Sequence, residues 1–492
     1  MLVTLVACYF AVTICIGFYA ARRVKNSADY LVAGRSLPLY MNTATVFATW
    51  FGAELILAVS STFLKEGLQG VVGDPFGAAF CLIFVAIFLA APYYRLKLMT
   101  VGDFYKKRYN RTIELASAAA ISISYLGWSS ANLVALGIVI HTVSGNAITL
   151  EQGIVLGAVI VGIYTLFGGM WSVAFTDLFQ TVIIVAGLIY IAWMLAGMAG
   201  GVDKVVATAQ ASDRLKFFPG ASLHDWLGFI AAFVTMALGS VAQQDVFQRV
   251  TSARTEKIAR QGTLLGGSLY LLMAFIPMFI AVSALLIDPG MVKQMLANEN
   301  DFQQVLPTLI LQRTPLFAQV LFFGALLSAI LSTASGTLLA PTAVITENVI
   351  QPLWGHKLSD RKMLVLLRLI LIGFTCCVTL FALQSESSMY QMVQDAYKVT
   401  LVAAFTPLIF GMFWRRATPQ GALLSMACGV VAWQYAEHFM SDALVPPQLV
   451  GLGSAIVGMI VGSLAPTLLG GQGHPEIVDL ARQPEVADNP PA

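Results

Sequence analysis

The chain has 492 residues, of which 58% are hydrophobic and 11% are charged, and its mean hydropathy is +0.78. Soluble globular proteins carry about 25% charged residues, so the composition excludes a soluble fold and indicates a polytopic membrane protein. The net charge of +2 gives no sign of a nucleic-acid partner.

Apolar segments long enough to cross a bilayer follow one another along the whole chain. They predict about thirteen transmembrane helices, at residues 2–21, 40–62, 74–94, 112–142, 150–168, 176–199, 225–247, 262–287, 316–346, 364–384, 389–413, 420–440 and 448–469. The predicted fold is therefore an all-α polytopic membrane protein with a single transmembrane domain over residues 1–470. Residues 471–492 are rich in Pro and in acidic residues, and we expect them to form a disordered tail.

The basic residues are divided unequally between alternate loops. One side receives Arg22, Arg23, Lys25, Arg35, Arg95, Lys97, Lys106, Lys107, Arg108, Arg111, Arg249, Arg254, Lys257, Arg260, Lys357, Arg361, Lys362, Arg415, Arg416 and Arg482. The other side receives Lys65, Lys204, Arg214, Lys216, Lys293 and Arg313. Because cytoplasmic loops are the basic ones, this division predicts an external N-terminus, a cytoplasmic C-terminus and location in the cytoplasmic membrane. The first segment lacks a basic residue before it and reads as a retained helix rather than a cleaved signal peptide.

Ionisable side chains inside predicted spans are the default functional candidates, because each is costly in lipid unless it meets a partner or a cavity. They are Glu54, Asp177, Asp245, Arg368, Asp395 and Lys398. Asp395 and Lys398 are three residues apart and can form an ordinary intrahelical ion pair. Asp177 follows Thr176, so a helix cap also explains it. Glu54 has no local explanation, and either a partner on another helix or a binding site accounts for it.

Two predicted helices contain a weak point near their middle. Gly52 lies in the second helix and Gly239 in the seventh. Interrupted helices expose backbone carbonyls that transporters use to hold ions and polar solutes, although one glycine in a spanning helix is common. The two helices lead two groups of five, over residues about 40–199 and 225–413, as expected of an inverted repeat with a site between its halves.

Hydroxyl and indole side chains mark two candidate sites. Ser332 and Thr333 are adjacent within the apolar run 317–349, where hydroxyls either allow close helix packing or ligate a cation. Trp50 and Trp128 lie at mid-depth of their helices, where they serve either as packing or as an aromatic wall for a small organic solute, cationic if the rings form a cage.

Six segments, in order, resemble the sodium:solute symporter family. They are DYLVAGRSLP (Asp29–Pro38), TVGDFYKKRYN (Thr100–Asn110), YTLFGGMWSVAFTDLFQ (Tyr164–Gln180), VFQRVTSARTEKIAR (Val246–Arg260), SAILSTASG (Ser328–Gly336) and FGMFWRRATPQGALLS (Phe410–Ser425). The resemblance covers residues from about 15 to 435. It implies a five-plus-five inverted-repeat core of the leucine-transporter type, with one helix before it and two after it.

The same resemblance implies a sodium site between the second and ninth predicted helices. The family pattern falls on Ala329, Ser332 and Thr333, and the facing backbone carbonyls fall on Ala48 and Phe51. The family's Thr-Asp pair corresponds to Thr176 and Asp177, where the carboxylate is thought to attract sodium on its exit path.

The resemblance is less informative about the solute. Sugar-transporting members carry Asn and Gln where this chain has Trp50 and Leu55, and proline-transporting members carry Asp at the position of Trp50. Choline-transporting members are similar at Trp50 and Trp128 but have a further Trp where this chain has Gln243. The expected solute is an amino acid, a betaine, a choline-like compound or a similar small molecule, bound by Trp50, Trp128, Gln243 and Glu54.

The function predicted from the sequence is sodium-coupled import of a small organic solute. Two alternatives remain open: a proton-coupled carrier using Glu54 and Asp177, and a symporter-like sensor that works with a separate signalling partner. A membrane enzyme is disfavoured, because no His, Cys or acidic cluster has nucleophile or metal spacing.

Overall fold

The computed structural model describes residues 2–297, 302–354, 358–385, 387–440, 443–466 and 473–482. Across these ranges the secondary structure is helical, apart from one isolated β-bridge between Leu37 and Ala253. Ten of the described helices are long and apolar enough to cross a membrane, and a bent pair raises the number to eleven.

Two features account for the difference from the thirteen predicted spans. Helix α9 (Leu150–Ala199) covers two of them, and Gly169 divides it at a kink with φ of 48°. A residue with a side chain would be strained at that φ, and its Cβ would also collide with the carbonyl of Tyr30. Helix α20 (Pro419–Phe439) covers another predicted span. Its hydropathy is lower than that of the ten helices counted as long and apolar enough to cross a membrane.

The first half of the chain runs from the N-terminus to the short helix α10. Its helices are α1 (Leu2–Ala21), α2 (Ser27–Val32), α3 (Leu39–Trp50), α4 (Ser60–Gly70), α5 (Ala78–Phe84), α6 (Ala90–Leu96), α7 (Val101–Arg108), α8 (Arg111–Val143), α9 and α10 (Val202–Ala211). Helix α3 and the segment Glu54–Gly70 form the bent pair, at an angle of 52°. Wide π-type turns join α5 to its neighbours within the span Val72–Leu96.

The second half repeats the pattern of a broken leading helix followed by longer ones. Its helices are α11 (Leu223–Gly239), α12 (Gln244–Thr251), α13 (Glu256–Ile287), α14 (Pro289–Ala297), α15 (Val305–Arg313), α16 (Leu316–Val344), α17 (Asp360–Gln384), α18 (Met389–Thr400), α19 (Thr406–Phe413), α20, α21 (Pro447–Leu464) and α22 (Glu476–Arg482). The repeat boundaries at residues about 40–199 and 225–413 remain predictions.

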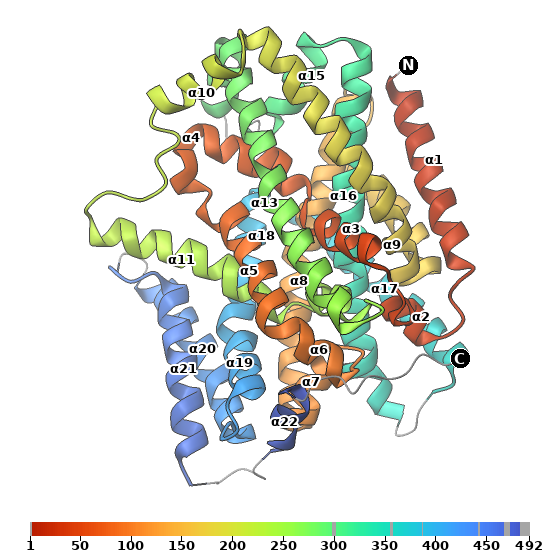
Figure 1. Ribbon diagram of the computed structural model, residues 1–492, viewed down its shortest axis with the longest axis vertical. Coiled ribbons are helices and arrows are strands. Elements are labelled where there is room, and N and C mark those ends of the chain that lie inside the picture. The colour runs from red at the N-terminus through yellow and green to blue at the C-terminus, as the bar shows by residue number, and fades with distance from the viewer. Residues whose placement is uncertain are drawn as a thin grey trace.

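Helix α16 lies in the middle of the molecule, with α1, α3, α8 and α9 packed around it (Figure 1). Every residue from Ala325 to Val344 is buried. A helix that is buried on all sides has no solvent or lipid to receive its polar groups. The hydroxyls of this helix must therefore find partners inside the protein.

Several helices begin where the sequence supplies a capping side chain. The Thr100 hydroxyl accepts a hydrogen bond from the Asp103 amide, and the Asp103 carboxylate accepts one from the Thr100 amide, which forms a capping box at the start of α7. Thr149 with Gln152 starts α9 in the same way, and Ser388 with Gln391 starts α18. These caps fix the positions of the loops that join the spanning helices.

The loops gather at two opposite ends of the helix bundle. At the basic end Arg95 forms an ion pair with Glu256 at 2.7 Å, and Arg35 donates to the carbonyl of Leu98. Helices α10 and α15 lie at the other end (Figure 1), and Arg214, which follows α10, donates to the carbonyl of Leu64. Which end faces the cytoplasm remains a prediction.

Part of the expected disordered tail carries structure. Residues Glu476–Arg482 form α22, and Ile477, Val478 and Ala481 are buried against the basic end. Asp479 forms an ion pair with Arg415 at 3.0 Å. The short apolar face of this segment packs on α6 and α19, which the composition of the whole tail does not reveal. Residues 467–472 and 483–492 lie outside the described residues.

Candidate functional site

The first element of the site is the break between α3 and the segment Glu54–Gly70. Phe51 has φ of −81° and ψ of 72°, and the Gly52 amide donates to the carbonyl of Trp50 at 2.9 Å. This is an inverse γ-turn. In a continuous helix the Gly52 amide would instead bond the carbonyl of Ala48, so the turn releases that carbonyl from its helical partner.

Thr333 packs directly on this break. A Cβ placed on Gly52 would lie 2.8 Å from Thr333 Oγ1, so only glycine allows the two segments to approach so closely. Thr333 Oγ1 donates to the carbonyl of Ala329 at 3.1 Å. Ala48, Phe51, Ala329, Ser332 and Thr333 are all buried. The structure therefore brings the predicted sodium-site residues of α16 to the broken part of α3.

Asp177 lies beside the same hydroxyls. Ser332 Oγ donates to Asp177 Oδ1 at 2.6 Å, and Asp177 Oδ2 is buried without a hydrogen-bond partner. The residue sits in the middle of the second part of α9, one residue after Thr176, whose hydroxyl bonds the carbonyl of Ser172 instead of capping a helix. The alternative interpretation of Asp177 as a capping-turn residue is wrong.

A buried arginine completes this cluster, and its prediction as a basic loop residue is wrong because it lies inside α12 (Gln244–Thr251). Arg249 on α12 is 1% exposed and donates through Nε and Nη2 to Thr49 Oγ1 at 3.1 and 2.8 Å. Its guanidinium interacts electrostatically with Asp177. A Cβ on Gly336 would lie 2.5 Å from Arg249 Nη2. Arg249 belongs to the VFQRV segment, whose hydrophobic neighbours could have drawn attention to it.

The predicted aromatic residues meet in one group. The rings of Trp50 and Trp128 lie 5.9 Å apart edge to face, and Tyr397 on α18 lies 6.4 Å from Trp50 and 5.6 Å from Trp128. All three side chains are buried. Tyr397 was missed by the sequence analysis, although it lies between Asp395 and Lys398, which form the expected ion pair at 2.9 Å.

Gln243 occupies the break in the second leading helix. Helix α11 ends at Gly239, and Gln243 has the extended values φ −75° and ψ 140° immediately before α12. Its Nε2 donates to Ser124 Oγ at 3.0 Å. Ser124 lies one helical turn before Trp128 on α8, so both breaks meet the same helix.

Asp245 links the two breaks. Trp50 Nε1 donates to Asp245 Oδ2 at 3.1 Å, and the hydroxyl of Tyr125 donates to Asp245 Oδ1. The Asp245 amide in turn donates to the Tyr125 hydroxyl at 2.9 Å. This carboxylate orients the Trp50 indole within the aromatic group, which the sequence could not indicate because the partners are far apart in the chain.

Glu54 lies just after the first break and meets another carboxylate. It is 9% exposed, its Oε1 has no hydrogen-bond partner, and it interacts electrostatically with Asp74. Asp74 accepts a hydrogen bond from the hydroxyl of Tyr270 on α13. Asp74 was overlooked because it begins a predicted span, where an acidic residue is unremarkable. Glu54 therefore has a neighbour on another helix, but that neighbour carries the same charge.

A model of the sodium:solute symporter family matches residues 30–429. The chain belongs to the sodium:solute symporter family. This symporter is 26% identical over 447 residues to the high-affinity proline transporter PutP of Bacillus subtilis, an alignment that covers 87% of this chain and 91% of that protein. It is 23% identical over 437 residues to the human high affinity choline transporter 1, covering 86% and 74% of the two chains.

Two solved structures share the fold of this symporter. A Na+-coupled sialic acid symporter in a substrate-bound outward-open state matches with a TM-score of 0.80 and 19% identity over 94% of this chain and 98% of that one. Mhp1, a nucleobase-cation-symport-1 family transporter in a closed conformation, matches with a TM-score of 0.60 and 13% identity over 88% and 93% of the chains. The all-α fold with a five-plus-five core is confirmed.

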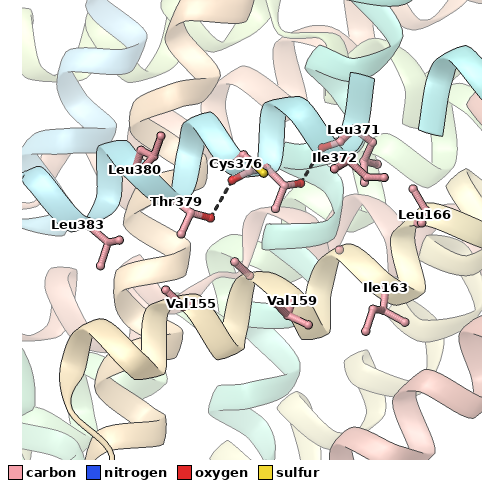
Figure 2. Close-up of a pocket in the computed structure, with 13 residues that line it drawn as sticks. Val155, Val159, Ile163, Leu166, Leu371, Ile372, Cys376, Thr379, Leu380 and Leu383 are labelled. Carbon is pink, nitrogen blue, oxygen red and sulfur yellow. Dashed lines mark hydrogen bonds between the residues drawn. The ribbon is translucent and has the colours of Figure 1, made fainter. Parts of the chain in front are cut away.

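An apolar groove of about 520 Å³ lies between the first part of α9 and α17 (Figure 2). Val159 and Leu380 on its walls are 52% and 60% exposed on the lipid-facing surface. The hydroxyls of Thr375 and Thr379 bond the carbonyls of Leu371 and Thr375 on their own helix, as the dashed lines show. The threonine hydroxyls of this groove therefore offer a polar solute no free donor.

Proposed function

We propose that this symporter couples the import of a small organic solute to sodium through a site formed by Ser332, Thr333 and the carbonyls of Ala48, Phe51 and Ala329. A sodium ion stripped of water needs oxygen ligands, and neutral hydroxyl and carbonyl oxygens are sufficient. Sodium bound there would join α3 to α16 and stabilise the arrangement that accepts solute. Nothing but the bilayer and the two transported species is needed as a partner.

One observation supports this assignment most directly. The Thr333 hydroxyl packs against Gly52 at the turn that releases the Ala48 carbonyl. A hydroxyl and a carbonyl without its helical partner thus meet at a buried point between two helices that must separate when the transporter changes conformation. A hydroxyl that only allowed close helix packing would not need the opposite helix to be broken.

The other predicted site residues are assigned to the exit path of the sodium ion and to the solute. Asp177, hydrogen-bonded to Ser332, would attract sodium as it leaves toward the basic end. The solute would bind at the aromatic group of Trp50 and Trp128, with Gln243 and Glu54 as polar contacts. Solute binding would then close the outer side, and the bundle would rock toward the cytoplasm.

The energy available from one ion is sufficient for strong accumulation. Moving one sodium ion through about 100 mV releases about 2.3 kcal/mol, and a tenfold concentration gradient adds about 1.4 kcal/mol. The sum corresponds to roughly a five-hundredfold accumulation of a neutral solute.

A thermal-shift measurement on the purified protein tests the sodium assignment. Sodium chloride is compared with potassium chloride at equal ionic strength for the wild type and for Ser332→Ala with Thr333→Ala. We expect sodium to raise the melting temperature of the wild type and to have little effect on the double variant. Thr342→Val is the matched control, because its buried hydroxyl bonds only the Leu338 carbonyl of the same helix. A full sodium response in the double variant would refute the assignment.

Proton coupling is the second candidate, because Glu54 Oε1 and Asp177 Oδ2 are buried without a hydrogen-bond partner. Proteoliposomes with a pH gradient and no sodium separate the two cases. Sodium coupling predicts no solute accumulation under these conditions. Proton coupling predicts accumulation that Glu54→Gln or Asp177→Asn removes.

We also propose that the basic end faces the cytoplasm of the cell and that the N-terminus lies outside. Arg22, Arg23 and Lys25 follow α1 at the same end as Arg95 and Arg254. Labelling of single cysteines placed in the loops at Lys25 and Gly220 of a variant without native cysteines, with an impermeant reagent on intact cells, tests the orientation. The reagent should reach the cysteine at 220 and not the one at 25.

A further inference from the structure

The carboxyl groups of Glu54 and Asp74 are not used by the proposed sodium site. Both are buried, at 9% and 2% exposure, and the segments Glu54–Val59 and Val72–Gly77 that carry them pack on each other. Glu54 belongs to the segment after the first break and Asp74 to the following span. A like-charged pair inside the membrane is costly without a countercharge.

The polar side chains around the pair leave hydrogen-bonding capacity free. The hydroxyl of Tyr270 donates to Asp74 Oδ1, whereas Glu54 Oε1 and the hydroxyl of Tyr397 are buried without a partner. Tyr397 is 0% exposed, and its helix α18 packs on the segment Glu54–Val59. Gln394 Nε2, one turn before Tyr397 on α18, also lacks a partner and lies against Gly73. Buried polar groups normally form hydrogen bonds, so these side chains have capacity that a polar ligand could use.

The chain supplies no fixed cation to this pair. Within the described residues neither Glu54 nor Asp74 forms an ion pair with a Lys or Arg side chain. Two neighbouring carboxyl groups in a low-dielectric site tend to retain one proton between them, so the pair matches a ligand with one positive charge. The aromatic group borders the same place, because Tyr397 contacts both Trp50 and Trp128.

We propose that Glu54 and Asp74 bind a primary or secondary ammonium group of the transported solute, while the rings of Trp50, Trp128 and Tyr397 contact its apolar part. The ammonium donates one N–H to each of the two carboxyl groups, and a primary ammonium has a third N–H that the Tyr397 hydroxyl oxygen can accept. This inference rests on the proposed function, since it assigns the solute class of the same site.

The arrangement also determines what the site rejects. A quaternary ammonium has the same charge but no N–H donor, so it would leave Glu54 Oε1 and the Tyr397 hydroxyl unpaired. Buried polar groups left unpaired cost more than an ordinary hydrogen bond contributes. Selectivity should therefore follow the number of N–H groups and not the charge alone.

Matched solute pairs test this selectivity on the purified protein in sodium chloride. L-proline is compared with its N,N-dimethyl betaine and ethanolamine with choline, within a panel of amines, amino acids, neutral sugars and carboxylates. We expect members with N–H groups to raise the melting temperature at concentrations at least tenfold lower than their fully methylated counterparts. The proposal is overturned if the methylated, neutral or anionic solutes stabilise the protein equally well, or if no amine stabilises it.

Variants connect the selectivity to the carboxyl pair. Glu54→Gln should raise the half-maximal concentration of the best amine at least tenfold. The ratio of half-maximal concentrations between the methylated and the unmethylated member of each pair should fall close to one. Glu66→Gln is the matched control, because Glu66 lies on the same segment with an exposed carboxylate. An unchanged amine affinity in Glu54→Gln contradicts the proposal.

The sodium response separates failure of this inference from failure of the proposed function. Stabilisation by sodium alone should persist in Glu54→Gln, since the proposed sodium ligands lie on α16 and before the break. It also reports that the variant is folded. If sodium stabilises the wild type and amine selectivity is absent, only the solute class is wrong. If sodium has no effect on the wild type, the proposed function fails.

Discussion

Two polar clusters flank the break in the first leading helix, and they treat charge in opposite ways. The Arg249 cluster comprises Thr49, Asp177, Arg249 and Ser332, and the Glu54 cluster comprises Glu54, Asp74, Tyr270 and Tyr397. In the first, a buried guanidinium donates to Thr49 through two nitrogens and to the backbone carbonyl of Asp245, and its charge acts on both Asp177 and Asp245. In the second, the segments that carry the two buried carboxyl groups pack on each other, and neither group forms an ion pair with a Lys or Arg of the described residues. The comparison teaches that buried carboxyl groups near one helix break differ in whether the chain itself supplies a positive charge, and the proposed ligand would supply it to the Glu54 cluster.

The largest expected effect comes from removing the fixed cation. Arg249→Ala removes the buried hydrogen bonds of the guanidinium to Thr49 and to the Asp245 carbonyl, and it removes the positive charge that acts on Asp177 and Asp245. Hydrogen bonds of a charged group contribute about 1.5–3 kcal/mol each to the free energy of unfolding. We expect a much lower melting temperature and no sodium-driven uptake. Arg249→Lys keeps the charge but not the two-nitrogen contact with Thr49, so its melting temperature should lie between those of Arg249→Ala and the wild type. If Arg249→Ala melted at the same temperature as the wild type, Arg249 would not stabilise the buried carboxylate of this cluster.

A smaller effect is expected at the break itself. Gly52→Ala puts a methyl group 2.8 Å from Thr333 Oγ1 and so displaces a proposed sodium ligand. The sodium concentration for half-maximal stabilisation should rise about tenfold, which corresponds to about 1.4 kcal/mol. Gly197→Ala on α9 is the control, because its Cβ would meet no atom within 4 Å. Equal sodium affinity in Gly52→Ala and Gly197→Ala would argue against ligation by Thr333.

Two hydroxyl deletions separate structure from ligand binding within the Glu54 cluster. Tyr270→Phe removes the donor of Asp74 and should cost about 1–3 kcal/mol of stability. Tyr397→Phe removes a hydroxyl that has no partner, so stability should change little while amine affinity falls severalfold. Melting temperatures with and without amine distinguish the two effects. A larger loss of stability in Tyr397→Phe than in Tyr270→Phe would contradict this division.

The smallest effect is expected at an exposed ion pair outside both clusters. Arg313 donates to Asp288 Oδ2 at 3.0 Å, and this hydrogen bond lowers the pKa of Asp288. Because the folded pKa is lowered, the contribution is present above the unfolded pKa of about 3.9 and is lost as the pH falls through the folded pKa. Asp288→Asn should lower the melting temperature at pH 7 by less than about 2 °C, with no difference at pH 2. A larger effect at pH 7 would weaken the contrast between buried and exposed charge.

The periodicity and hydropathy of the sequence were sufficient to predict the helical fold. An apolar segment must satisfy its backbone within itself in lipid, so spans can be read from a run of residues with little regard to neighbours. The same reasoning located the breaks at Gly52 and near Gly239, because glycine weakens a helix locally. It divided α9 into two spans, although their junction at Gly169 depends on the contact with Tyr30.

The site was predicted only in part. Ser332, Thr333, Trp50 and Trp128 could be singled out because each is unusual at membrane depth within its own segment. Asp74 and Tyr397 could not, because each is ordinary in its segment and becomes notable only through a partner from a distant one. Arg249 was counted as a loop residue, although its hydrophobic neighbours are a signal of burial.

The sequence by itself determined that this protein crosses the membrane many times, which loops share a side and which helices are interrupted. These properties depend on local composition and on backbone hydrogen bonding within one segment. Only the tertiary structure decided which carboxylate received a cation, since Coulomb interactions depend on distances between helices that sequence spacing does not give. Arg249 beside Asp177, and Glu54 beside Asp74 without such a neighbour, are the outcome of that packing.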